Sequence, residues 1–326
     1  MIQPRTLTLA ALSLLPAASL AQDSRSLDLT IGGYGLSIGD SRRVNGLRIN
    51  FRDSRLEKVN GVNITIWTPY EDMGRGVVNG MALGLPATGA REINGIAAGV
   101  FGVGAERRIR GIGVAPLGIG AGDELRGIMI GGLGLGGGGD VVGIGGLGIG
   151  SGGPIEGIMI GGLGVGSGGR TKGILVGGVG AGVGETLTGL GIGGVGVGVG
   201  GDVTGILIGG VGAGVGGTLK GLGIGGVGIG ASRIEGIAIG GLGVGGLEVK
   251  GGVLAGGFFR IERGGRFEGV SISAYNQIRG RQEGLTIGLL NYARRLSGYQ
   301  VGLINIARSN PRGTRVLPIF NADFSR

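Results

Sequence analysis

A glycine-anchored unit recurs about every sixteen residues through most of this chain. Four consecutive copies start at Gly157, Gly173, Gly189 and Gly205, and they read GIMIGGLGVGSGGRTK, GILVGGVGAGVGETLT, GLGIGGVGVGVGGDVT and GILIGGVGAGVGGTLK. A fixed period is typical of stacked repeat architectures, in which each unit contacts only its neighbours. The fold question therefore reduces to the conformation of one unit.

The residues of the unit can be sorted into columns, with the anchor Gly as column zero. Columns one and three are apolar, as in Ile158 and Ile160, and columns six and eight are apolar again, as in Leu163 and Val165. Each pair has the period of two that is typical of a strand, but the step from three to six changes the phase. A bend at columns four and five would turn both pairs inward, so we expect all four columns to line the core.

Glycine occupies the bend itself in the regular copies. Gly lacks a Cβ and adopts positive φ at little cost, and both properties suit a corner. The column-four glycines are Gly161, Gly177, Gly193 and Gly209.

Asparagine marks two further columns. In the early copies an Asn-Gly pair precedes column one, and such a pair indicates a turn. In the last copies Asn takes column seven, where the central copies have Gly, which suggests a left-handed backbone. Stacked Asn amides at this column would also bond along the stack. The late residues are Asn276, Asn291, Asn305 and Asn321.

These patterns predict an all-β chain, a β-solenoid of about 16-residue coils whose backbones pair at roughly 4.8 Å. A meandering outer-membrane β-barrel is the alternative, because sixteen residues also suffice for one spanning strand and a turn. Column two supports that alternative, since it alternates small and large residues, as in Gly191, Leu207 and Gly223. The phase change in nearly every unit favours the solenoid.

The N-terminus is typical of a secretory signal peptide. Arg5 is followed by a short apolar run, Leu7 to Ala21, which ends in Ser-Leu-Ala before Gln22. We predict a signal peptide over residues 1–21 and a single Gly-rich repeat domain over 22–326. The regular core of that domain covers about 95–257, and Arg-rich coils with a cap cover 258–326. The expected location is the periplasm, the outer membrane or the surface of a bacterium.

Positive charge is concentrated at the C-terminal end. Residues 256–326 contain eleven Arg against four acidic residues, a balance of +7. This end could face an anionic envelope surface, such as lipopolysaccharide or phospholipid headgroups, or another envelope protein. Solvated turns that simply carry Arg are the plainer interpretation. The candidate contacts are Arg279, Arg281, Arg294, Arg295, Arg308 and Arg312. Tyr275 and Tyr292 in the same coils could contact a sugar or a protein, although capping or core packing is the plainer interpretation.

The residues give no indication of catalysis or of a cofactor. The chain has no His and no Cys, which removes His-based catalysis and most transition-metal sites. GxGxxG recurs through composition alone, without the strand, helix and acidic residue that a dinucleotide site needs. A nucleic-acid partner is disfavoured because the Arg residues of this chain are not interleaved with aromatic residues on one element. We expect no enzyme, no cofactor, no metal, no nucleic-acid partner and no small-molecule substrate.

The closing units, EGLTIGLLNYARRLSGYQVGLINIARSNPRG and LPIFNADF, together with the early VNGLRIN and VNGVNIT, resemble a family of exported bacterial surface-repeat proteins first noted in spirochaetes. Those proteins carry repeated G-L-x-I-G-L-x-N segments and a similar LPIFN ending. The resemblance covers residues 267–324 well, 44–100 less closely, and the centre only in spacing. It implies export and envelope placement and brings no catalytic residue.

Three functional hypotheses follow. The first is a non-enzymatic exported structural or interaction protein, and the second is an outer-membrane channel. The third is a polysaccharide-active enzyme on a β-helix, which requires three or more carboxylates that converge in a groove.

Overall fold

The computed structural model describes residues 26–69, 76–137 and 143–323, so the predicted signal peptide lies outside the described residues. These residues form 27 strands and no helix. Residue contacts divide the chain into two compact units, up to Pro116 and from Leu117 onward. The prediction of one repeat domain over 22–326 stays a prediction.

The first unit contains seven strands. They are β1 Ser26–Ile31, β2 Tyr34–Gly39, β3 Arg43–Asn50, β4 Lys58–Thr65, β5 Val77–Gly84, β6 Ala87–Gly99 and β7 Gly102–Ala115.

The second unit contains twenty. They are β8 Gly118–Ala121, β9 Glu124–Gly131, β10 Gly134–Gly137, β11 Gly143–Gly145, β12 Gly148–Ser151, β13 Ile155–Gly161, β14 Gly164–Ser167, β15 Thr171–Gly177, β16 Gly180–Val183, β17 Leu187–Gly193, β18 Gly196–Val199, β19 Val203–Gly209, β20 Gly212–Gly225, β21 Gly228–Gly240, β22 Gly243–Ala255, β23 Phe258–Ile272, β24 Tyr275–Ile287, β25 Leu290–Leu296, β26 Tyr299–Ala307 and β27 Val316–Ala322.

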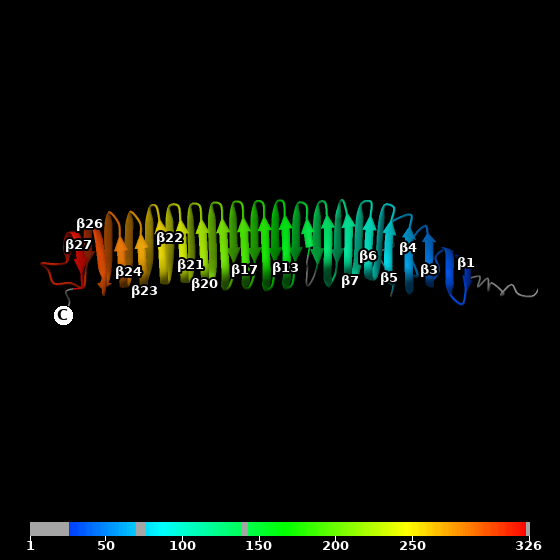
Figure 1. The fold of residues 1–326 in the computed structure, drawn as a ribbon, viewed down its shortest axis with the longest axis horizontal. Coiled ribbons are helices and arrows are strands. Elements are labelled where there is room, and N and C mark those ends of the chain that lie inside the picture. Colours follow the sequence, from blue (N-terminus) through cyan, green and yellow to red (C-terminus); the bar gives the residue numbers. More distant parts are fainter. Residues whose placement is uncertain (1–25, 70–75, 138–142, 324–326) are drawn as a thin grey trace, which may run out of the picture. The chain divides into compact units, whose positions relative to one another are not determined.

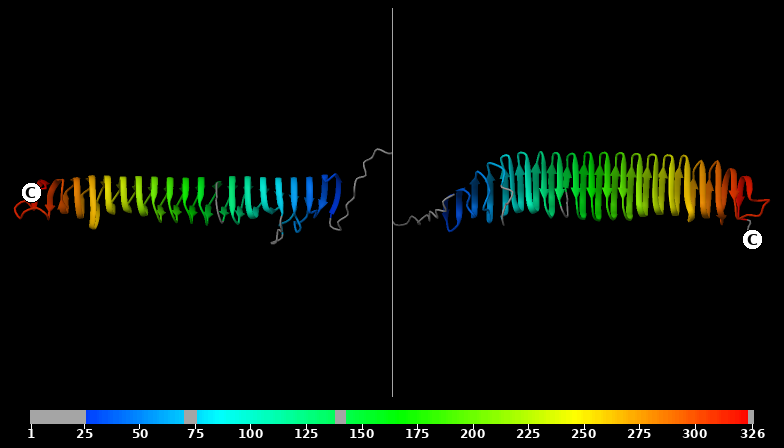
Figure 2. Two further views of the ribbon diagram at one scale, coloured as in Figure 1. Left: turned by 90° about the horizontal axis from the view of Figure 1, so that it is seen from below. Right: turned by 180° about the vertical axis from the view of Figure 1, so that it is seen from behind.

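Each regular coil has a longer and a shorter strand. In the coil anchored at Gly173, β15 covers columns minus two to four and β16 covers columns seven to ten. The strands of the regular coils pair in parallel with their counterparts one coil away, as β13 pairs β15 and β14 pairs β16. Figures 1 and 2 show the coils of the second unit following one another in this way. The β-solenoid prediction is confirmed, and the meandering alternative, which needs antiparallel neighbours, is wrong.

Antiparallel strands close the outer end of each unit. In the first unit β1 pairs antiparallel with β2, and in the second β27 pairs antiparallel with β26. A strand that reverses direction cannot start another parallel coil, so each pair ends the stack of its own unit.

The core lies on a different face of the longer strand from the one predicted. Columns minus two, two, eight and ten point inward, as Leu187, Leu175, Val165 and Val183 do. The prediction for columns one, three and six was wrong: Ile158 is 51% exposed and Leu163 57% exposed. Both faces of the longer strand carry aliphatic residues, and a period of two alone does not tell which face is covered.

Column two alternates in size because neighbouring coils share the space inside. A Cβ on Gly191 would lie 2.8 Å from Cδ2 of Leu187 and 3.0 Å from Cδ1 of Leu207. The large side chain of one coil therefore fills the gap left by the glycine of the next, at the close packing typical of protein interiors. The alternation therefore reflects this interdigitation and does not indicate a repeat of hairpins.

Anchor glycines are required for two reasons. Gly173 has φ +135°, and a Cβ there would overlap the carbonyl oxygen of Gly157 in the preceding coil. The same arrangement recurs at the described anchors from Gly46 to Gly284, where φ lies between +121° and +142°. The anchors therefore form a continuous contact of backbone on backbone from Gly46 to Gly111 in the first unit and from Gly157 to Gly284 in the second.

The corner glycines at column four are buried and crowded, yet their φ is not positive. A Cβ at Gly161, Gly177, Gly193 or Gly209 would overlap a carbonyl oxygen three residues further along the chain. Column four therefore needs Gly for the close approach of the two strands of one coil. The part of the prediction that invoked positive φ was wrong.

The interior of the first unit is polar near its N-terminal end. Arg48 is fully buried; it forms an ion pair with Asp53 and donates to Asp40 and to Asn63, both at 2.8 Å. Burial acts to raise the pKa of Asp40, but hydrogen bonds from the Ser54 side chain and backbone and the charge of Arg48 outweigh it and lower that pKa. This buried network takes the place of aliphatic packing in the first coils.

Candidate functional site

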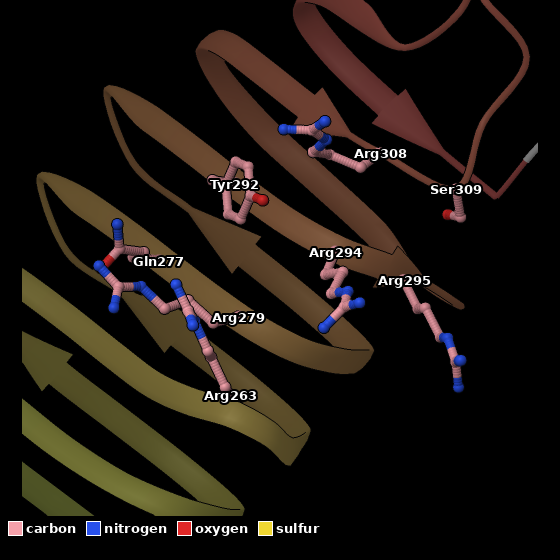
Figure 3. A pocket seen from close by; sticks show the side chains of 8 residues that line it. All are labelled: Arg263, Gln277, Arg279, Tyr292, Arg294, Arg295, Arg308 and Ser309. Carbon is pink, nitrogen blue, oxygen red and sulfur yellow. The ribbon is translucent and has the colours of Figure 1, made fainter.

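A hollow lined by arginines opens on the last coils of the second unit (Figure 3). Its volume is about 890 Å³. The lining residues are Arg263, Gln277, Arg279, Tyr292, Arg294, Arg295, Arg308 and Ser309.

Strand register stacks three of these arginines. Ile278 pairs with Ala293, and Ala293 pairs with Ala307, so the residues that follow them, Arg279, Arg294 and Arg308, occupy one column of three successive coils. The amide of Arg308 continues the pairing by donating to Ala293 O at 3.0 Å. Neighbouring coils are about 4.8 Å apart, so the three side chains start from one closely spaced line. We call Arg279, Arg294 and Arg308 the arginine ladder.

No carboxylate neutralises this ladder within the part of the chain that the structure describes. The same holds there for Arg263 and Arg295. Elsewhere in the second unit, cations pair with acids on neighbouring coils: Arg233 with Glu248 at 2.7 Å and Lys250 with Glu268 at 3.5 Å, for example. The three guanidinium groups carry like charges on successive coils and repel one another, so a bound anion would relieve the ladder.

The other predicted arginines lie outside this hollow or are already paired. Arg281 forms an ion pair with Glu283 at 2.6 Å and does not line the hollow. Glu283 also accepts from Arg266 and, through that hydrogen bond and its charge, raises the pKa of Arg266. Arg312 is exposed beyond β26 and does not line the hollow either.

The sequence prediction omitted Arg263, Gln277 and Ser309. Gln277 and Tyr292 pair in register on the outward side of the shorter strand, which places them beside the ladder. Ser309 Oγ accepts from the backbone amide of Leu296 at 3.1 Å and so ties the last coil to the preceding one. The coil period applied to the predicted Tyr292 could have identified Gln277, whereas Arg263 lies in an irregular stretch of β23.

Buried asparagine amides lie on the interior side of these strands. Asn276 Nδ2 donates to Asn291 Oδ1 at 2.8 Å, and Asn291 Nδ2 donates to Asn305 Oδ1 at 2.7 Å. All three are fully buried. The amide ladder confirms the expected bonding along the stack for these three residues and holds the coils beneath the hollow in register.

The predicted column and backbone of these asparagines were wrong. Asn276 pairs with Phe259, and the same column continues to Val244 and Ile229, so the asparagines replace inward apolar residues. Among the described non-glycine residues only Ile319 has positive φ. The coil lengths vary by one residue in this region, which displaced the sequence alignment by one column.

Two asparagine predictions fail elsewhere. Asn321 belongs to the antiparallel β27 and donates to Asn305 O at 3.3 Å and to Thr314 O at 3.2 Å, outside the amide ladder. The early Asn-Gly pairs lie within β3 to β6 and do not form turns. Their amides form an exposed ladder instead, with Asn60 donating to Asn45 at 2.6 Å and Asn79 donating to Asn60 at 2.9 Å.

Other chemistry is sparse within residues 26–69, 76–137 and 143–323. No three acidic side chains there gather in a way that would hold a metal ion. The same residues contain no helix long and apolar enough to cross a membrane. No protein-family model, curated protein or solved structure matches the chain.

Proposed function

We propose that this β-solenoid is an exported, non-enzymatic structural and interaction protein, a repeat scaffold at the bacterial cell envelope or surface. The stacked coils support a scaffold role, because such stacks provide extended surfaces for binding. The predicted signal peptide and the resemblance to exported surface-repeat proteins support the location.

The arginine hollow is the observation that carries the contact we propose. Its ladder and its neighbours Arg263 and Arg295 lack acidic partners in the described structure, while cations of the same unit such as Arg233 and Lys250 have them. Guanidinium groups bind phosphate through paired hydrogen bonds, and Arg is more weakly hydrated than Lys. The partner we propose is an anionic envelope surface that presents phosphate groups, as phospholipid headgroups and lipopolysaccharide do.

Vesicle flotation tests this contact. The chain, as purified from the cells that express it, should float with vesicles that contain phosphatidylglycerol. It should stay at the bottom of the gradient when the vesicles contain phosphatidylcholine alone. Binding should weaken between low and physiological salt, because exposed charges are screened over about 8–10 Å. The triple variant Arg279→Gln, Arg294→Gln, Arg308→Gln should lose at least about tenfold in binding, since it removes three charge-assisted contacts.

The matched control removes three positive charges that already have acidic partners, in Arg233→Gln, Lys250→Gln and Arg266→Gln. It should float like the unmodified chain, because only the unpaired arginines are proposed to bind. Equal losses in both variants would show that net charge alone drives the binding. Vesicles made with lipopolysaccharide distinguish the two phosphate sources, and failure to bind either source would overturn the proposed contact.

A further inference from the structure

Two ladders of aliphatic residues lie on the outward side of the longer strands in the second unit. The column-one ladder runs through neighbouring strands from β13 to β21, and the column-three ladder from β13 to β22 (Figure 1). The column-one ladder is Ile158, Ile174, Leu190, Ile206, Leu222 and Ile237. The column-three ladder is Ile160, Val176, Ile192, Ile208, Ile224, Ile239 and Leu254. We call these residues the aliphatic face.

The fold does not require apolar residues at these positions. Column minus one points outward on the same strands and holds polar residues, such as Lys172, Thr188 and Thr204. Thr supports a strand about as well as Ile or Val does. The aliphatic residues therefore do something that strand formation alone leaves unexplained.

The face is large enough for a stable protein interface. Members such as Ile206 and Ile237 are 40% and 52% exposed. Five of the thirteen side chains are exposed and the other eight are half-buried, so the two ladders present roughly 400–800 Å² of apolar surface. A standard interface buries about 800 Å² on each partner, whereas a monomer rarely exposes a contiguous apolar patch of more than a few hundred Å².

The border of the face favours a protein over a membrane. Column minus one carries both signs of charge, with Glu156 and Glu235 among Lys172, Lys220 and Lys250. Along this edge the face has a polar rim beside an apolar centre, as protein interfaces do. Membrane-surface elements are instead rich in Lys and Arg and carry Trp or Phe on the apolar side, and neither ladder contains an aromatic residue.

The spacing of the ladders points to a second copy as the occupant. Side chains in each ladder repeat at the coil spacing of about 4.8 Å, and sheets that pack face to face interdigitate at about 10 Å. A second copy presents the same spacing over the same length, and a pairing of identical faces closes as a symmetric dimer. We infer that the aliphatic face is a self-association surface on which two copies of this chain pack through their longer strands.

Oligomeric state tests this inference directly. The whole chain, as purified from the cells that express it, should sediment as a dimer at micromolar concentration without detergent. The variant Ile206→Arg with Ile237→Arg should dissociate, with a rise of about a hundredfold or more in the dissociation constant, because pairing would bury unpaired charges. Both side chains point into solvent in the single copy, so circular dichroism should keep the β signature.

The matched control places the same charges on the shorter strands, as Gly182→Arg with Gly198→Arg. Both glycines are exposed and have open space where a Cβ would lie. This control should remain dimeric. A monomeric unmodified chain, or a control that dissociates as readily as the face variant, would overturn the inference.

A membrane is the competing occupant, and the same proteins distinguish it. If the unmodified chain is monomeric and floats with phosphatidylcholine vesicles, and the face variant does not float, the face binds lipid and the inference fails. The dimer does not depend on the arginine hollow, so loss of anionic-vesicle binding leaves this test unaffected.

Discussion

At the residue scale, glycine has different functions in different columns. Column zero combines positive φ with a backbone neighbour, as at Gly173, and column four combines ordinary φ with a close carbonyl, as at Gly177. At column nine, Gly182 has ordinary φ and nothing within 4 Å of where a Cβ would lie. The first two columns need glycine for the coil, whereas column nine does not.

Alanine substitution separates these cases. Gly173→Ala should lower the free energy of unfolding by at least about 1–2 kcal/mol, the cost of a left-handed residue, and more through the overlap with Gly157. Gly182→Ala should raise it by about 0.5–1 kcal/mol, because glycine in a strand loses more backbone entropy than alanine. Urea denaturation followed by circular dichroism measures both, and equal effects would contradict the column assignment.

Asparagine ladders differ in burial, and their substitutions should differ accordingly. Asn291→Ala removes the donor to Asn305 Oδ1 and one of the acceptors of Asn276 Nδ2, which keeps its hydrogen bond to Ile287 O, at a cost of about 1–3 kcal/mol for each unsatisfied group. Asn60→Ala interrupts an exposed ladder, in which the amides of Asn45 and Asn79 can form hydrogen bonds to water instead. The free energy of unfolding should therefore fall by no more than about 0.5 kcal/mol. Thermal unfolding of the two variants compares them, and a larger loss for Asn60→Ala would be inconsistent with the burial.

At the element scale, a coil is two strands joined by tight corners, and the ends are closed by strands that reverse direction. The first coils also hold the buried network around Arg48, in which Asp40 accepts from Arg48 at 2.8 Å and from Ser54. Removal of one partner from a buried ion pair leaves the other charge uncompensated, which is strongly destabilising. The stability of the first coils therefore depends on the ionisation of this network.

Acid should weaken the first unit through Asp40. Its pKa is lower in the folded chain than the ordinary value of 3.8, so the folded state favours the charged form. The stabilisation is present above pH 3.8 and is lost as the pH falls through the lower, folded pKa. Hydrogen exchange of β3 and β4 between pH 5 and pH 2.5 should show this loss, and Asp40→Asn should reduce the pH dependence.

Much of the coil could be predicted from the sequence, and the failures have identifiable physical causes. The corner at Gly161 and the strand lengths follow from Gly-Gly and the phase change. The inward face of the longer strand could not be predicted, because Ile158 and Met159 are both apolar. Only the packed coil shows that Met159 is buried and Ile158 exposed. The concentration of positive charge in the last coils could be predicted. Which of these arginines have no acidic partner could not, because that depends on the register of the strands.

At the scale of the whole molecule, each unit repeats one coil whose two outward faces differ. The longer strands of the second unit carry the aliphatic face, the shorter strands of its central coils carry mostly glycine, and the arginine hollow lies at its last coils. A stack of this kind can hold separate contacts for a second copy and for an anionic surface. The two contacts can therefore be removed independently.

Export should leave a defined N-terminus. We predict cleavage after Ala21, because Ser19-Leu20-Ala21 has the small residues that signal peptidases require. Intact-mass measurement of protein recovered from the cell envelope should give a chain that begins at Gln22. Recovery of the chain from the cytoplasm with residues 1–21 still attached would contradict the predicted export.

The stack itself is tested most directly by distances along one column. Glu156, Lys220, Glu235 and Lys250 are exposed or half-buried residues of column minus one, which parallel pairing connects coil by coil. The chain has no native Cys, so spin labels can be attached to Cys introduced at Glu156 and at one other position, with unlabelled protein in excess. Double electron–electron resonance should give distances that correspond to backbone separations of roughly 19, 24 and 29 Å from position 156 to positions 220, 235 and 250. The separation should therefore rise by about 4.8 Å per coil. Distances that do not increase from one coil to the next would contradict the parallel solenoid.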